Sequence, residues 1–150
     1  MADSQPSALV DKRFRDTLKG FLDQHGCRAE WRMGGHDDPI PLLLRIDVTR
    51  SYTGLSADVL WAHKHWQRAA LRRSIALNVM GRSINVLHPE DLILMKLDAA
   101  GPQDLLDVQA LLASPPVEID LRRLKRSATR VRIRKLLDTC LRAADGKTRS

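Results

Sequence analysis

Three side chains of the kinds that bind metal ions stand side by side in this sequence. His36, Asp37 and Asp38 could supply one imidazole nitrogen and two carboxylates to a metal ion. Their surroundings, residues 33–41, also hold two Gly and two Pro, a composition typical of a loop. Because adjacent loop residues rarely converge on one ion, we interpret these three as loop residues and predict no metal site here.

Other histidines and cysteines give no stronger pattern. His63 and His65 would point to opposite faces of a strand, or about 200° apart on a helix, so we expect no zinc site from them. Cys27 and Cys140 are far apart in the sequence, whereas structural zinc sites use paired ligands at short spacing. A single disulfide stays open as an alternative, but we interpret both residues as reduced thiols of a cytoplasmic protein.

The positive charge of the chain lies in its carboxyl-terminal part. The net charge is +7, and residues 117–150 hold eleven Lys and Arg against four Asp and Glu, so the preceding residues sum to zero. A solvated helix face is the default interpretation, and binding of RNA, DNA or an acidic partner is the alternative. For that alternative the candidate nucleic-acid-binding residues are Arg126, Arg130 and Arg134. We interpret the three tryptophans as packing residues rather than as base-stacking platforms.

The composition is that of a globular protein. A length of 150 residues fits one domain, and 43% of the residues are hydrophobic and 29% charged. No apolar run approaches the ~20 residues needed to cross a bilayer, and the amino terminus lacks the apolar core of a secretory signal. We therefore expect a cytoplasmic protein with no membrane partner.

The spacing of apolar residues predicts helices and strands in alternation. A helix is expected over residues 10–25, where Gly26 is placed to end it. A hairpin is expected at 42–61, with a turn around 52–54, and a second hairpin or a kinked pair of strands is expected at 75–87. Asp120 is the expected N-cap of a last helix that runs from residue 121 to about 144. The other expected elements are a strand at 28–32 and helices at 63–73, 89–100 and 104–112.

This order of elements indicates an α/β (α+β) fold, with a small mixed sheet flanked by helices. We expect a flexible tail at residues 1–8, a domain at 9–114 and a basic helical extension at 115–150 that packs on the domain. No internal repeat is present.

Residues 84–114 (INVLHPEDLILMKLDAAGPQDLLDVQALLAS) carry a resemblance to a known family. A strand, a Pro-Glu-Asp-Leu that leads into a helix with a Lys, a loop and an Asp-x-x-Asp helix follow one another, as in the carboxyl-terminal half of bacterial nucleotidyltransferase-fold proteins of the AbiEii/AbiGii toxin type. Upstream, a helix that ends in Gly, a loop with Asp-Asp-Pro, an apolar strand and a second strand with an Asp also fit. The resemblance covers about residues 10–114.

The resemblance implies a Mg²⁺-dependent transfer from a nucleoside triphosphate, in which strand carboxylates hold the metal. It makes Asp58 the later carboxylate of the metal site, Lys96 the family's helix lysine, and Asp104 and Asp107 the paired nucleotide-site carboxylates. Alternatives stay open for each residue. Asp58 could cap a turn or face solvent, Lys96 could extend to solvent from the edge of the core, and the two later Asp could be an N-cap and a helix-dipole partner.

Two features of the family are missing from this sequence. The family's opening Gly-rich turn and Asp-x-Asp strand do not occur, and Gly101 and Gln103 stand where the family has Arg and Lys. Asp47 would add a second carboxylate if a turn at Tyr52-Thr53 placed it opposite Asp58. We therefore expect a truncated or catalytically defective nucleotidyltransferase-like protein, or half of a split enzyme. The missing segment would come from a partner chain or lie upstream of Met1, and the exposed sheet edge would pair with a partner or a second copy.

Overall fold

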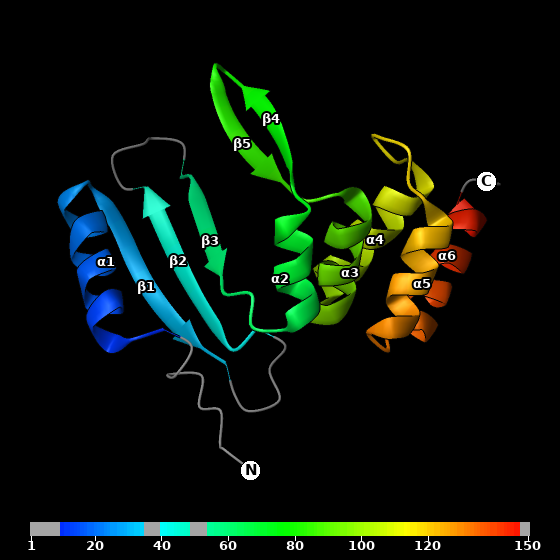
Figure 1. The fold of residues 1–150 in the computed structure, drawn as a ribbon, viewed down its shortest axis with the longest axis horizontal. Helices are drawn as coiled ribbons and strands as arrows, with labels where there is room; N and C mark the ends of the chain where they lie inside the picture. The colour runs from blue at the N-terminus through cyan, green and yellow to red at the C-terminus, as the bar shows by residue number, and fades with distance from the viewer. Residues whose placement is uncertain (1–9, 35–39, 49–53, 148–150) are drawn as a thin grey trace, which may run out of the picture. The chain divides into compact units, whose positions relative to one another are not determined.

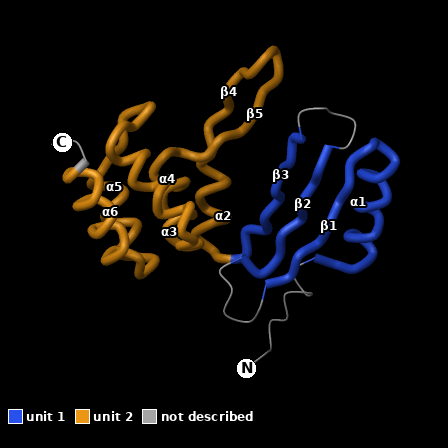
Figure 2. The backbone as a smooth tube through the Cα atoms, turned by 180° about the vertical axis from the view of Figure 1, so that it is seen from behind, with its two compact units in different colours: residues 1–63 blue, residues 64–150 orange. Residues whose placement is uncertain are grey.

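The structure is a computed structural model that describes residues 10–34, 40–48 and 54–147. It has an α+β fold, as the sequence indicated, in which the described strands form two small antiparallel sheets rather than one mixed sheet (Figure 1). The chain divides into two compact units, residues 1–63 and 64–150 (Figure 2). The expected tail at 1–8 lies outside the described residues.

Unit 1 is a three-stranded antiparallel sheet with one helix. Its elements are α1 (Lys12–Gln24), β1 (Cys27–Met33), β2 (Leu42–Val48) and β3 (Ser56–Leu60), and the strand order is β1-β2-β3. The Asp11 side chain caps α1 by accepting a hydrogen bond of 3.2 Å from the Arg13 N–H. Gly26, with φ of 73°, makes the left-handed turn into β1, which α1 contacts.

The two faces of this sheet differ in character because side chains alternate along each strand. Ala29, Leu42 and Leu44 are buried on one face. The other face is charged, and there Glu30, Arg45 and Asp58 lie opposite one another across the three strands.

The register of β2 and β3 differs from the pairing that would join two carboxylates. Asp47 lies opposite Ser56, and Asp58 lies opposite Arg45, so Asp47 is only a diagonal neighbour of Asp58. The pairing of Asp47 with Asp58 is therefore wrong, because the register is shifted by two residues. The turn residues on which it rested, Tyr52 and Thr53, lie outside the described residues.

Unit 2 consists of a β-hairpin and five helices in its described residues. Its helices are α2 (His65–Arg72), α3 (Pro89–Ala99), α4 (Pro102–Ala113), α5 (Leu121–Arg130) and α6 (Arg134–Lys147), and its strands are β4 (Ile75–Val79) and β5 (Arg82–Val86). Met80 and Gly81 turn the hairpin with φ of 51° and 77°, the positive values that a tight two-residue turn requires. The structure thus contains both predicted hairpins.

The core of unit 2 joins four helices. Helix α3 packs against α4 and α5, and α6 packs against α4 and α5. The segment after residue 114 therefore belongs to the same compact unit as α2 to α4 and shares their core. The buried residues of this core are Ile93, Leu94, Leu97, Val108, Leu124, Ala128, Leu137 and Cys140.

The prediction of a single helix from residue 121 to about 144 is wrong, because the chain forms two helices that are separated between Arg130 and Arg134. Arg132 has a left-handed φ of 65°, and the Ile133 N–H donates a hydrogen bond of 2.9 Å to the Ala128 carbonyl, which closes the turn. β-Branched residues at 129, 131 and 133 lower the local helix propensity. The break lets Leu137 on α6 and Leu124 on α5 enter the same core.

Among the helices that the structure describes, none combines the length and the apolar character that crossing a bilayer would require.

Candidate functional site

Asp58 on β3 is held by an arginine on the neighbouring strand. Arg45 Nε and Nη2 donate hydrogen bonds of 2.8 and 2.7 Å to the two oxygens of Asp58. These hydrogen bonds lower the pKa of the Asp58 carboxyl and raise the pKa of the Arg45 guanidinium. Both oxygens of Asp58 are therefore occupied by a bidentate ion pair on the charged face of the sheet.

This arrangement does not fit a magnesium site by itself. Mg²⁺ is held by one or two carboxylates together with substrate phosphates. An ion at Asp58 would have to displace the Arg45 guanidinium, and the partner of Asp47 in the ladder is Ser56. Across the residues that the structure describes, no group of three or more His, Cys, Asp or Glu side chains could hold a metal ion. His36, Asp37 and Asp38 lie outside those residues.

Lys96, Asp104 and Asp107 come together between α3 and α4. Lys96 Nζ donates to Asp107 at 2.7 Å and to Asp104 at 3.2 Å, and Gln103 Nε2 donates to the other oxygen of Asp107 at 2.7 Å. The hydrogen bond to Asp107 is the main cause that raises the pKa of the Lys96 amine, and the same bond lowers the pKa of the Asp107 carboxyl. The three residues that the resemblance implies form one charged cluster.

The backbone of α4 excludes one of the alternatives for Asp104, that of an N-cap. Gly101 is the N-cap of α4, and Asp104 lies in the first turn of the helix. Asp104 is therefore not an N-cap. Its position near the helix N-terminus still favours a negative charge.

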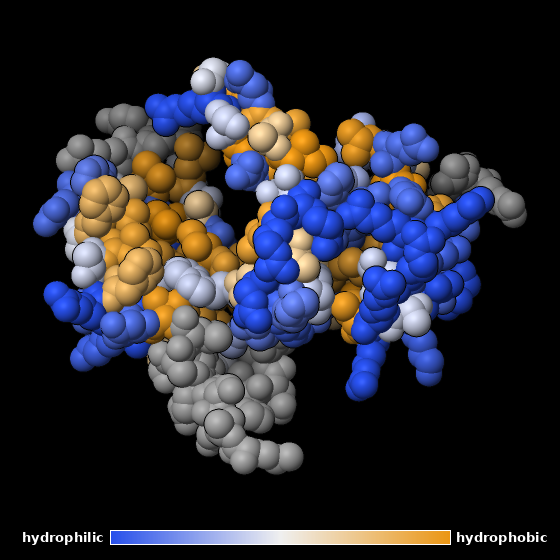
Figure 3. All heavy atoms as spheres, viewed as in Figure 1, coloured by the Kyte–Doolittle hydropathy of each residue, from blue (hydrophilic) through white to orange (hydrophobic). Residues whose placement is uncertain are grey.

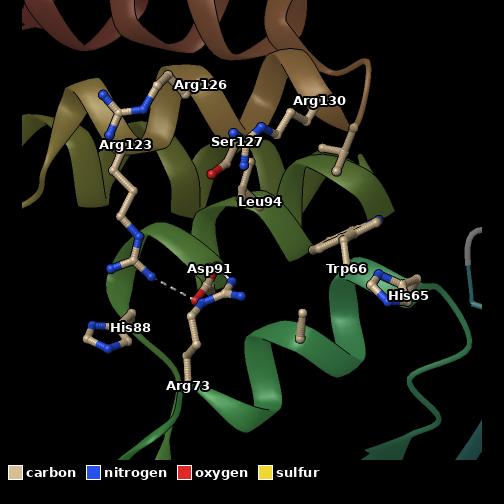
Figure 4. A pocket seen from close by; sticks show the side chains of 12 residues that line it. His65, Trp66, Arg73, His88, Asp91, Leu94, Arg123, Arg126, Ser127 and Arg130 are labelled. Carbon is tan, nitrogen blue, oxygen red and sulfur yellow. Dashed lines mark hydrogen bonds and ion pairs between the residues drawn. The ribbon is translucent and has the colours of Figure 1, made fainter.

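A hollow lined by arginines lies among α2, α3 and α5 (Figure 4). We call it the arginine hollow. Its volume is about 760 Å³, within the range of small-molecule and cofactor pockets. It is lined by His65, Trp66, Ala69, Arg73, His88, Asp91, Leu94, Arg123, Arg126, Ser127, Arg130 and Val131.

Asp91 forms the base of the arginine hollow and fixes two of its arginines. The residue is only 2% exposed, in the first turn of α3. Arg73, which ends α2, donates to its Oδ1 at 2.7 Å, and Arg123 of α5 donates to its Oδ2 at 3.4 Å. Figure 4 shows both guanidinium groups next to this carboxylate. The buried carboxylate thus orients two cations whose remaining N–H groups stay available.

Two further arginines of the hollow have no such partner. Arg126 and Arg130 are exposed, and within the described part of the chain neither forms an ion pair. They lie four residues apart, and hence on one side of α5. Figure 3 shows hydrophilic side chains gathered over α5 on the face in view. The hollow therefore presents four guanidinium groups against one carboxylate, which favours an anionic ligand.

Arg134 belongs to a different environment. It lies on α6, does not line the hollow, and donates to both oxygens of Asp138 at 2.9 and 3.0 Å. The structure thus brings Arg126 and Arg130 together and separates Arg134 from them.

Comparison of the chain with protein-family models, with curated proteins and with solved structures found no match.

Sequence reasoning missed part of the arginine hollow. Arg73 and Asp91 lie in different elements, and no spacing along the chain links them to α5. Glu90 and Asp91 lie in the first turn of α3, where a negative charge complements the helix dipole. Glu90 is 5% exposed and Asp91 is 2% exposed, and the sequence alone does not reveal this burial. A buried carboxylate requires a hydrogen-bonding partner, so knowledge of the burial would have indicated that partner residues lie nearby.

Proposed function

We propose that this chain binds a nucleic acid through the arginine hollow, with the arginines on the phosphate backbone. The observation that carries the proposal is the excess of guanidinium groups over carboxylates in a concave site. Arg126 and Arg130 are charged, exposed and free of ion pairs within the described residues. Arginine forks match the oxygens of a phosphate in bidentate geometry, and phosphate contacts supply most of the affinity of nonspecific nucleic-acid binding.

Charge reversal tests this proposal. We expect the double variant Arg126→Glu, Arg130→Glu to lose about 10-fold or more in affinity for a fluorescent oligonucleotide at low salt. The control Arg122→Glu reverses one charge on the same helix at an exposed position outside the hollow, and Arg126→Glu and Arg130→Glu should each, as single variants, lose more affinity than this control. Arg134→Glu is a second control on α6. An equal loss in the double variant and in both controls, or no loss in any of them, would contradict the proposal.

A second proposal follows from the Lys96 cluster and from the family resemblance. We propose that the chain is part of a nucleotidyltransferase-like enzyme whose metal-binding carboxylates come from a partner chain. The resemblance makes Lys96 a catalytic residue and makes Asp104 and Asp107 nucleotide-binding residues. Lys96 lies within hydrogen-bonding distance of both carboxylates. Strand β3 is an edge strand of its sheet: it pairs with β2 on one side, and no strand of the described residues pairs with it on the other side. A partner strand could pair there.

The second proposal is tested by co-expression with the product of the adjacent reading frame. We expect a stable complex that transfers a labelled nucleotide in the presence of Mg²⁺, and loss of transfer in Lys96→Met. A stable monomer that binds no partner would contradict it. Transfer by the isolated chain that Asp58→Asn abolishes would contradict the expectation that a partner is needed.

A further inference from the structure

The arginine hollow contains an aromatic side chain beside its cations. Trp66 lines the hollow from the first turn of α2, and its side chain is also packed against the core of unit 2. Trp31 and Trp61 pack against each other in unit 1, with ring centroids 5.3 Å apart. Among the described residues Trp66 has no aromatic neighbour of this kind. Figure 4 shows its ring between α2 and the Arg130 end of α5.

We propose that the ligand of the arginine hollow is a single-stranded nucleic acid, with a base stacked on Trp66 and the adjoining phosphates on the arginines of α5. This inference rests on the proposed function and adds the class of nucleic acid. Proteins that bind single strands combine a basic groove for the backbone with aromatic side chains for the bases. The arginine hollow holds both kinds of group in one concavity.

The row of arginines on α5 fits more than one phosphate. Arg123 and Arg130 are seven residues apart, about 10 Å along a helix axis. Phosphates of one strand follow one another about every 3.4 Å along the axis of B-form DNA, and they lie farther apart in an extended single strand. A strand that runs along α5 can therefore place two or more phosphates beside Arg123, Arg126 and Arg130. A free nucleotide would use only part of this row.

The concave shape of the site favours a single strand over a duplex. The bases of a duplex are stacked inside a rigid cylinder, whereas those of a single strand can turn out and stack on a side chain. Asp91 at the base of the hollow is 2% exposed, so the site is concave rather than flat. A duplex would contact the rim of the hollow with its phosphates but could not present a base to Trp66.

The test compares five probes that vary in base content, sugar, strandedness and length. They are an oligothymidylate of about ten nucleotides, an abasic strand of the same length, an oligouridylate, a hairpin duplex and ATP. We expect the base-bearing strands to bind about 5- to 150-fold more tightly than the abasic strand, because stacking of one base strengthens binding by about that factor. The two base-bearing strands distinguish DNA from RNA. Equal affinity for the abasic strand, or tighter binding of the duplex or of ATP, would overturn the inference.

Trp66→Leu should remove the preference for base-bearing strands and leave the affinity for the abasic strand unchanged. A variant with Trp31→Phe and Trp61→Phe keeps the hollow intact and makes Trp66 the only tryptophan. Its fluorescence should be quenched by the oligothymidylate and not by the abasic strand, and quenching that is equal for both strands would overturn the inference without relying on Trp66→Leu. If both strands bind equally and Arg126→Glu weakens both, the proposed function stands and this inference fails. If no probe binds, both fail.

Discussion

The Arg73 guanidinium donates a hydrogen bond of 2.7 Å to Asp91, a carboxylate that is 2% exposed. Arg123 donates to the other oxygen at 3.4 Å. One buried charge thus connects the end of α2, the first turn of α3 and the first turn of α5. Because these three elements line the arginine hollow, Asp91 supports both the fold of unit 2 and the placement of two of its cations.

Asp91→Ala should lower the free energy of unfolding by about 2–3 kcal/mol, because it leaves two arginines without their buried acceptor. Denaturant titration followed by circular dichroism measures the change. The control is Asp145→Ala, an exposed position on α6, for which we expect a change within about 0.5 kcal/mol. A loss for Asp91→Ala no larger than that of the control would contradict the role assigned to this carboxylate.

Leu124→Ala should be among the most destabilising changes in α5. Leu124 is 0% exposed in the core of unit 2, and truncation of a buried leucine typically costs about 2–5 kcal/mol. Leu121 lies on the same helix but is 43% exposed, so Leu121→Ala should have a much smaller effect. Thermal or denaturant unfolding of the two variants checks the difference, and equal losses would argue against the packing of α5 on α3.

The Lys96 cluster predicts a pH-dependent contribution to stability. Lys96 lowers the pKa of Asp107, so this contribution is present above the ordinary Asp pKa and is lost as the pH falls through the lowered value in the folded protein. In the folded protein the pKa of the Lys96 amine is raised above its ordinary value of 10.5. The contribution is therefore also lost as the pH rises through this raised pKa. The difference in unfolding free energy between the wild type and Lys96→Met should therefore be constant at neutral pH and shrink at both extremes.

Arg45→Met provides a matched comparison for that pH profile. Arg45 lowers the pKa of Asp58, so its contribution is also lost in acid. An arginine keeps its charge at high pH, so the alkaline loss should be absent. Identical alkaline behaviour of the two variants would contradict the assignment of the alkaline loss to Lys96.

The two thiols should differ in reactivity. Cys140 is 2% exposed, and burial raises the pKa of its thiol, whereas Cys27 on β1 is partly exposed. The thiolate is the reactive form, so native protein should react rapidly with a thiol reagent at Cys27 and slowly at Cys140. In Cys27→Ser, labelling should require denaturant. Rapid labelling of native Cys27→Ser would contradict the burial of Cys140.

Local patterns in the sequence predicted the elements well. Helix α1 and the N-cap at Asp120 depend on neighbouring residues and are found in the structure, where the Asp120 side chain accepts a hydrogen bond of 2.9 Å from the Arg123 N–H. Helix α1 has no fully buried residue, and its Phe14 and Phe21 are exposed. The break at Arg132 was not predicted, because the apolar spacing continues across residues 131–137 and hides the change of direction.

The candidate sites depend on contacts that spacing does not encode. The sequence identified Arg126 and Arg130 as basic, but their grouping with Arg73 around Asp91 arises from the packing of α2, α3 and α5. The residue opposite Asp58 depends on the strand register. Because the register is shifted by two residues, this residue is Arg45 and not Asp47. Residues that act together from distant elements were therefore the least predictable part of the site.

The salt dependence of oligonucleotide binding tests the central claim most directly. If the arginine hollow binds phosphates, the logarithm of the binding constant falls linearly with the logarithm of salt concentration, by about 0.7 per phosphate neutralised on a single strand. The account predicts that Arg126→Glu, Arg130→Glu reduces this slope by about one to two units, while Arg122→Glu leaves it nearly unchanged. Binding without salt dependence, or the same slope in all three proteins, would contradict it.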